Sequence, residues 1–464
     1  MFRKIFRWLA FGIACLITLA ALVIAEENWR GKHAWERYKH ELEARGEQLS
    51  LIALAPPAVP DDQNFATTPL LKPLFPHGAI YVDKLRKRLE PADVTGDRSC
   101  PSAGNRWFGR PADWNAWRAY LQKTNVVQRL EAVEAELSEI GAASRRPYAR
   151  FAIPYEDGVQ AVDALLPHFA LLRMLARIYS VRATVQLARG QGEGAAADVE
   201  TILRLADSLR DEPLLISQLV RIAIQQLGLQ DLWEGLVQHQ WSDAQLAGFQ
   251  AELERVDFVS GSLLAMRGER AFFNDTFAQP ELASTSAKIF SGFFYQNMLA
   301  VNRFGEEQMF PIFNPAEHRI DPRKADFGRR QLLQMRRTPY NVFIRRLLPA
   351  LFEIVPRFAS VQTGVDEAMI ACALERYRLV HGQFPETLDV LTPQFIAKLP
   401  NDIINGRALK YRRTGDGGFV LYSVGWNETD DGGKVAIWKN GSPEIEDGDW
   451  VWFSQPQPSA GERK

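Results

Sequence analysis

The feature that most constrains this chain is an uncharged run near its N-terminus, from Trp8 to Ala25. Folded as a helix with a rise of 1.5 Å per residue, the run spans roughly 27 Å, close to the ~30 Å hydrocarbon core of a bilayer. Thr18 is its one polar residue, and a threonine hydroxyl can bond to the helix carbonyl four residues earlier. The run therefore predicts a helix that crosses a membrane through residues 8–25.

The charges that flank this run have opposite signs. Those before it are Arg3, Lys4 and Arg7, and those after it are Glu26 and Glu27. Because cytoplasmic flanks of membrane helices are rich in Lys and Arg, we expect a single-pass protein of the inner (cytoplasmic) membrane, with its N-terminus in the cytoplasm and its C-terminal bulk outside. The alternative is a signal peptide cleaved before Glu26, since Val23 and Ala25 form a small-residue cleavage pattern. The run exceeds the ~7–15 residues of a signal-peptide core, which favours a retained anchor. Under both interpretations the rest of the chain is exported from the cytoplasm.

The composition indicates a folded protein without a nucleic-acid partner. Hydrophobic residues make up 46% and charged residues 24%, which is ordinary globular usage. The formal net charge of −1 lacks the basic excess of nucleic-acid binders. Of the three cysteines, Cys15 lies in the predicted span. Cys100 and Cys372 could form one disulfide or remain two separate thiols.

We expect a mainly α protein with a small C-terminal α+β module. It would consist of an N-terminal transmembrane helix, a bundle of helical hairpins, and then a helix with a short antiparallel sheet. The segments are a membrane anchor with a juxtamembrane helix at 1–54, an irregular Pro-rich connector at 55–110, a helical domain at 111–350 and the α+β module at 351–464.

The middle of the chain has helical periodicity. Apolar residues from Leu171 to Val185 fall on one helical face, and a glycine-rich turn at 190–194 separates them from a second apolar stripe at 199–209. Pro213 opens a third helix that we expect to reach about residue 238. Ser242 and Gln245 match a capping box, which predicts the start of a fourth helix.

The chain has no recognisable catalytic motif: no Gly-x-Ser-x-Gly, no His-Glu-x-x-His, no phosphate-binding loop and no Cys-x-x-Cys. Glu317, His318 and Asp321 could form an acid–base site, although a solvated polar loop is the simpler explanation. The aromatic residues within 257–350 could line an apolar cavity or insert into a membrane surface, but packing in a core is the simplest explanation. An arginine-rich run in the same region predicts a solvated face or one near anionic lipid headgroups; it contains Arg329, Arg330, Arg336, Arg337, Arg345 and Arg346.

The last hundred residues carry an ordered series of short motifs. A helix that we expect to open at Asp366 and to end near Gly382 is followed by Phe384-Pro385, then Leu399-Pro400-Asn401-Asp402. Strand-like runs at 408–413 and 419–424 are joined by a glycine-bearing hairpin. An acidic loop at 427–433 comes next.

This series resembles the C-terminal domain of the major pseudopilins of type II secretion systems, over residues 366–452. The whole chain also resembles an uncharacterised group of bacterial single-pass envelope proteins. In pseudopilins the acidic loop binds calcium, so the resemblance implies that Asn427, Asp430 and Asp431 are metal ligands, with later acidic positions at Asp447 and Asp449. Calcium takes oxygen ligands of these types. A solvated turn is the alternative, and Asn427 departs from the usual Asp.

The N-terminus departs from the pseudopilin pattern, because no Gly-Phe cleavage pair precedes the span and no Glu lies within it. We therefore expect a tethered protein rather than a filament subunit. The predicted function is that of a non-enzymatic scaffold or interaction protein with an envelope protein as partner. The alternatives are a membrane-tethered hydrolase or ligand-binding protein with its site in residues 257–350, and an accessory component of a type II secretion-like system.

Overall fold

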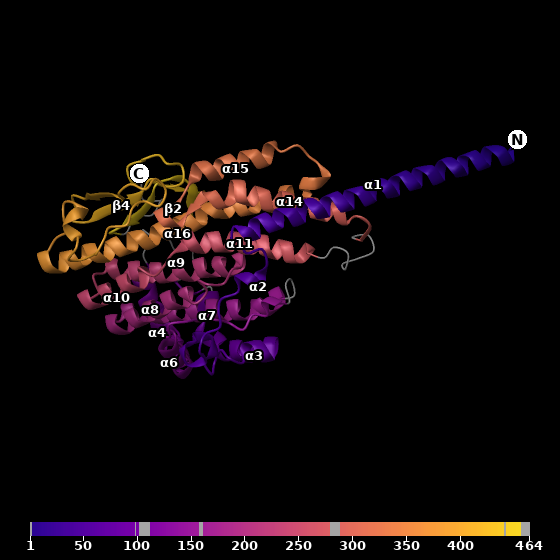
Figure 1. Cartoon of the computed structure of the whole chain (residues 1–464). Coiled ribbons are helices and arrows are strands. Elements are labelled where there is room, and N and C mark those ends of the chain that lie inside the picture. Colours follow the sequence, from indigo (N-terminus) through magenta and orange to yellow (C-terminus); the bar gives the residue numbers. More distant parts are fainter. Residues whose placement is uncertain are drawn as a thin grey trace.

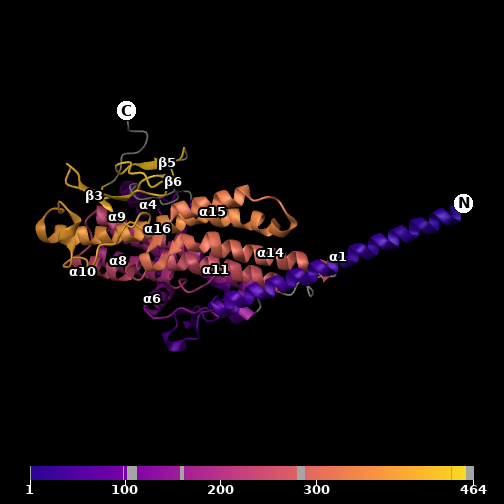
Figure 2. The same ribbon diagram turned by 45° about the horizontal axis from the view of Figure 1, so that its top comes forward.

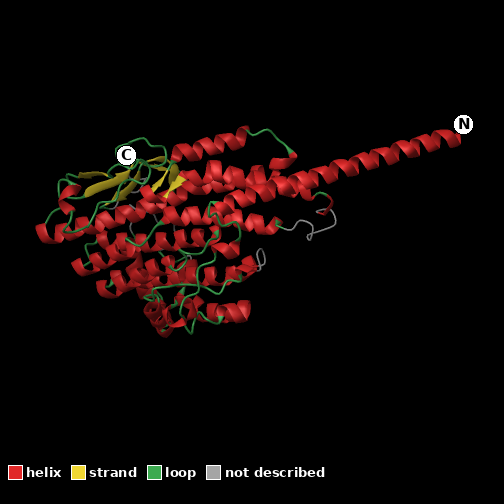
Figure 3. Cartoon of the chain, viewed as in Figure 1, coloured by secondary structure: helices red, strands yellow, loops and turns green. Residues whose placement is uncertain are grey.

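The computed structural model of the chain describes residues 2–97, 99–101, 112–156, 161–278, 288–439 and 442–455. Helices form most of it, and the strands gather beside the C-terminal end (Figure 3). The α-helices are α1 (Phe2–Ala44), α2 (Leu51–Leu54), α3 (Leu74–Leu89), α4 (Trp114–Lys123), α5 (Val126–Glu131), α6 (Glu134–Ala143), α7 (Ala161–Ala188), α8 (Gly192–Asp207), α9 (Leu215–Val237), α10 (Asp243–Leu253), α11 (Phe258–Phe277), α14 (Ser291–Phe304), α15 (Pro322–Gln334) and α16 (Val342–His381). The strands are β1 (Phe313–Asn314), β2 (Arg319–Ile320), β3 (Lys410–Arg413), β4 (Phe419–Ser423), β5 (Val435–Ile437), β6 (Pro443–Gly448) and β7 (Trp450–Phe453). The predicted fold class, mainly α with a small C-terminal sheet, is confirmed.

Helix α1 has two halves with different surroundings. Its N-terminal half projects alone from the body (Figure 1), and its apolar side chains are exposed. By length and composition this helix can cross a membrane. Within it, the Thr18 hydroxyl donates to the carbonyl of Ala14 at 2.9 Å, as the sequence predicts.

The C-terminal half of α1 packs along α14. Its buried positions Gly31, Trp35 and Leu42 fall on one helical face. The two backbones come very close, because a Cβ atom added at Gly31 would lie 2.8 Å from the carbonyl oxygen of Gly292. The Asn28 side chain bridges the contact: it donates to the carbonyl of Ile289 at 2.9 Å and accepts from the Gly292 amide at 2.7 Å. Helix α1 is therefore continuous with the folded body.

The remaining helices build two adjoining hydrophobic cores. Helices α7, α8 and α9 pack on one another in succession, and residues from all three contribute to both cores. The predicted hairpin helices are confirmed within a few residues, including the capping box between Ser242 and Gln245 that opens α10. Cys100 and Cys372 belong to different cores, so they do not pair with each other.

Two predictions about secondary structure differ from the structure, one for the connector and one for the start of a helix. The connector at 55–110 contains α3, because Pro76 falls in the first helical turn, where proline is tolerated. The helix expected to open at Asp366 begins instead at Val342, as α16 continues through Pro349 and Pro356. The sequence boundary between residues 350 and 351 thus falls inside α16.

The C-terminal module packs on the second half of α16. Strands β3, β4 and β7 form one antiparallel sheet, in which Tyr411 pairs with Leu421 and Leu421 with Trp452. The indole of Trp233 on α9 donates to the carbonyl of Phe453 at 2.7 Å. The module therefore shares its core with the helices.

The contact between α1 and α14 can be tested with one substitution. We expect Gly31→Leu to destabilise the packing by about 1–3 kcal/mol, because a larger side chain cannot fit against the Gly292 backbone. The measurement is thermal unfolding of the detergent-solubilised chain. Gly12→Leu is the matched control, since nothing lies within 4 Å of a Cβ atom there. Equal midpoints for the two variants would contradict this packing.

Candidate functional site

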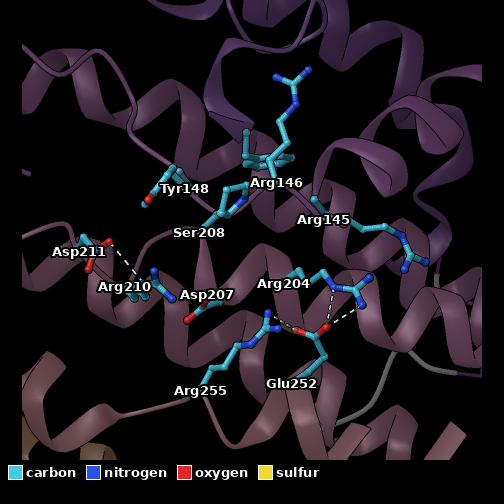
Figure 4. Close-up of a pocket in the computed structure, with 14 residues that line it drawn as sticks. Arg145, Arg146, Tyr148, Arg204, Asp207, Ser208, Arg210, Asp211, Glu252 and Arg255 are labelled. Carbon is cyan, nitrogen blue, oxygen red and sulfur yellow. Dashed lines mark hydrogen bonds and ion pairs between the residues drawn. The ribbon is translucent and has the colours of Figure 1, made fainter. Parts of the chain in front are cut away.

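The candidate site is an arginine-lined pocket of about 450 Å³ on the helical body (Figure 4). Its walls come from the segment that follows α6, from the last turn of α8 with the turn after it, and from the end of α10 with the turn after it; Phe65 completes the lining. Five arginines and three acidic residues line it: Arg145, Arg146, Arg204, Arg210 and Arg255, with Asp207, Asp211 and Glu252. The lining therefore carries an excess of positive charge.

Ion pairs hold several of these arginines in place. Arg204 donates to Glu252 from Nε at 2.9 Å and from Nη2 at 2.7 Å, and Arg255 approaches the other oxygen of the same carboxylate at 3.4 Å. Arg204 Nη1 is buried without a hydrogen-bond partner among the described residues. Figure 4 shows Arg204 and Arg255 converging on Glu252, while Arg145 and Arg146 extend away from it. Guanidinium groups in this arrangement can recognise a carboxylate or a phosphate.

A buried ion pair supports one wall of this pocket. Arg221 on α9 is buried, its Nη2 atom lies 3.6 Å from Asp207 Oδ1, and it stacks on the ring of Phe258. Burial lowers the pKa of the Arg221 guanidinium, an effect that Asp207 opposes. Burial also raises the pKa of the Asp207 carboxyl against the attraction of Arg221 and Arg210. The charges beneath the pocket are thus fixed by the packing of α8 against α9.

The structure does not bring Glu317, His318 and Asp321 together. His318 lies in the turn between β1 and β2, in the left-handed region at φ 51°, and its Nε2 atom lies 3.4 Å from Asp366 Oδ2. The interaction with Asp366 raises the pKa of the His318 imidazole, although burial opposes the rise. Glu317 Oε2 lies 3.9 Å from Arg319 Nη1. The Asp321 carboxylate accepts hydrogen bonds from two backbone amides at the start of α15.

The partner of His318 belongs to a buried carboxyl cluster that the sequence analysis missed. Asp366, Glu367 and Asp402 are all buried where α16 meets the C-terminal module. Asp402 accepts hydrogen bonds from Ser423 Oγ at 2.9 Å and from the amides of two further residues. Asp366 and Glu367 are adjacent acidic residues within an otherwise apolar stretch of helix, and this pattern could have indicated the cluster from the sequence. Acidic residues also favour the first turn of a helix, and the pair was interpreted as a helix start.

Burial raises the pKa of the Glu367 carboxyl well above its ordinary value, and the negative charges of Asp402 and Asp366 raise it further. Glu367 Oε1 has no hydrogen-bond partner among the described residues. The carboxyl therefore favours its protonated form at the junction between α16 and β4. Its position is structural, since it lies within the packed interior.

The acidic loop predicted to bind calcium lies between β4 and β5. Asn427 donates to Asp447 at 2.9 Å, whereas Asp430 accepts from the Tyr422 hydroxyl at 3.0 Å and pairs with Lys410 at 3.4 Å. The side chain of Asp431 has no hydrogen-bond or ion-pair partner among the described residues. Three carboxylate or imidazole ligands for one metal are not gathered anywhere in the described part of the chain. In this arrangement Asp430 pairs with a lysine and Asn427 with Asp447. Calcium at Asn427, Asp430 and Asp431 stays a prediction.

Asp449 orders this loop from within the module. Its buried carboxylate accepts from the amide of Gly433 at 2.6 Å and from those of Asp431 and Lys434 at 3.3 Å each. Burial raises the pKa of the Asp449 carboxyl, while these three amides oppose the rise. A side chain therefore occupies the position where the loop amides converge.

No protein-family model matches this chain, and no curated protein or solved structure is significantly similar to it. The fold and the site define a class on their own: a mainly α protein with one apolar N-terminal helix, an arginine-lined pocket and a small sheet module.

The Glu367 carboxyl gives a pH-dependent prediction. A carboxyl whose pKa is higher in the folded than in the unfolded chain binds more protons when folded, so it costs stability as the pH rises above about 4.3. Glutamine does not titrate. We therefore expect Glu367→Gln to gain stability relative to the wild type between about pH 5 and about pH 8. Thermal unfolding midpoints across this range provide the test, and a difference that stays constant with pH would refute the assignment.

Proposed function

We propose that this chain is a membrane-anchored interaction protein whose body lies on the extracytoplasmic side of the inner membrane. One observation carries the proposal: the exposed apolar half of α1 runs without a break into a half that is fixed to α14. A helix built in this way holds the body at a set distance from the bilayer. The basic residues before the span and the acidic residues after it support an N-terminus in the cytoplasm.

The resemblance of residues 366–452 to pseudopilin C-terminal domains supports the same side of the membrane. It also supports an envelope protein as partner, in a scaffolding role or as an accessory of a secretion-like system. The arginine-lined pocket is the surface that we assign to this partner, through a carboxylate or phosphate group that the partner carries. No catalytic role is proposed for the pocket.

A second candidate function is ligand binding within residues 257–350. The observation that favours it is an apolar cavity of about 480 Å³, lined largely by side chains of this region. The volume falls within the roughly 300–1,000 Å³ of small-molecule sites.

The anchor and its orientation predict how the chain behaves in cells. Expressed in a Gram-negative bacterial host, the full chain should stay in the membrane fraction after alkaline carbonate extraction. External protease should degrade its body in spheroplasts, because the body would face outward. Release by carbonate, or an N-terminus that begins at Glu26, would show a cleaved signal peptide instead. A body protected in intact spheroplasts would reverse the orientation.

The partner pocket predicts a selective loss of crosslinks. Arg145 and Arg255 are mostly exposed and lie at the pocket, so Arg145→Gln with Arg255→Gln removes positive charge with little effect on packing. We expect crosslinking in intact envelopes to lose partners that the wild type captures. The control is Arg189→Gln with Arg412→Gln, two exposed arginines that do not line the pocket. The same crosslinked set from both double variants would remove the pocket from the proposal.

A further inference from the structure

The apolar cavity lies between α11, α14 and the start of α16. Aromatic and aliphatic side chains form most of its wall, among them Phe272, Phe273, Phe277, Phe310, Phe343 and Leu347. Two charged groups in the wall are compensated within the protein. Arg270 pairs with Glu47 at 2.7 Å and with Glu306 at 2.5 Å, and burial raises the pKa of the Glu269 carboxyl. The interior therefore suits an uncharged, flexible hydrocarbon.

A cationic hollow adjoins this cavity. It has a volume of about 460 Å³, and Val342 and Arg346 line both spaces. Arg337 and Arg346 are exposed, and neither side chain has a hydrogen-bond or ion-pair partner among the described residues. Arg345 differs, because it donates to the carbonyl of Met335 at 2.6 Å. The hollow that adjoins the apolar cavity thus carries two positive charges without a partner among the described residues, and one of them, Arg346, also lines the cavity.

The hollow lies beside the point where α1 leaves the body. Asn28, which holds the start of α14, comes three residues after Ala25, a distance of about 4.5 Å along the helix. Next to it, Ile289 and Phe290 are 47% and 51% exposed. Tyr340, two residues before Val342, interacts with Glu27 of α1. In Figure 2, the start of α14 lies beside α1 on the side where α1 leaves the body.

Exposed apolar residues continue along the segment that forms the hollow. Leu333 is 72% exposed, and Val342 and Leu347 are each 44% exposed, interspersed with Arg337 and Arg346. A surface that mixes apolar and basic side chains matches the interface of a bilayer with anionic headgroups. The hollow and the cavity together therefore match an amphipathic anion.

We propose that the cavity and the hollow bind one anionic phospholipid from the membrane that α1 spans, with an acyl chain in the cavity and the phosphate on Arg337 and Arg346. This inference rests on the proposed function, because it requires α1 to lie in the bilayer. Two uncompensated arginines favour a headgroup with net negative charge over a zwitterionic one. The lipid would fix the face of the body that meets the membrane.

The test uses the full chain in detergent and two short lipids with identical chains, dioctanoyl phosphatidylglycerol and dioctanoyl phosphatidylcholine. Binding to the folded state raises the unfolding midpoint, so we expect a larger rise with the anionic lipid. Arg337→Gln with Arg346→Gln should raise its apparent dissociation constant about 30-fold, since each arginine contributes about 1 kcal/mol and 1.4 kcal/mol is tenfold. Arg189→Gln with Arg412→Gln should leave it unchanged.

A second variant tests whether an acyl chain of the lipid binds in the apolar cavity. Thr276 is exposed and lines the cavity, so Thr276→Trp should occupy the space of an acyl chain and abolish the midpoint rise with both lipids. Equal rises with the two lipids, a full response of the arginine double variant, or an equal rise with inorganic phosphate alone would each overturn the proposal. The outcome is separable from the anchor, because a chain that resists carbonate extraction but lacks lipid selectivity refutes only this inference.

Discussion

The architecture depends on the close backbone contact between α1 and α14. Two glycines, Gly31 and Gly292, let the helices meet where any Cβ atom would clash, and Asn28 satisfies the backbone groups at the start of α14. Another contact, the ion pair between Arg45 and Glu306 at 3.8 Å, holds only the end of α1. With the contact between α1 and α14, the exposed apolar half of α1 and the packed core are joined by one continuous helix, so α1 leaves the body in a defined direction.

Buried charge has a second organising role, away from that contact. Asp366 and Glu367 lie in the middle of α16, where they meet His318 and Asp402 at the junction with the C-terminal sheet. Burying carboxyls costs free energy unless they are hydrogen-bonded or protonated. Asp402 receives four hydrogen bonds, and the raised pKa of Glu367 favours its neutral form. The module is thus joined to the helices by specific polar contacts as well as by apolar packing.

Local patterns in the sequence were sufficient for some elements and insufficient for others. The apolar run at 8–25, the helical stripes of α7 to α9 and the Ser242 cap depend on neighbouring residues, and each was predicted. The predicted start of α16 at Asp366 was wrong. The helix continues through Pro349 and Pro356, and the tertiary packing that tolerates these prolines leaves no local pattern in the sequence. The arginine-lined pocket was missed, since its charged residues come from three separate segments of the chain. His318 was singled out, but its partner Asp366 lies on another element.

We infer that α1 holds one face of the body against the membrane, with Val342 near the mouth of the apolar cavity at headgroup depth. A spin label at Val342→Cys, in the Cys15→Ser background, tests it in lipid bilayers; the remaining cysteines are buried. If this face meets the membrane, the label at Val342→Cys is accessible to oxygen dissolved in the bilayer and shielded from a water-soluble relaxation agent. A label at Arg189→Cys is accessible to the water-soluble agent and shielded from the dissolved oxygen. Equal exposure of both labels to the aqueous agent would contradict the inference.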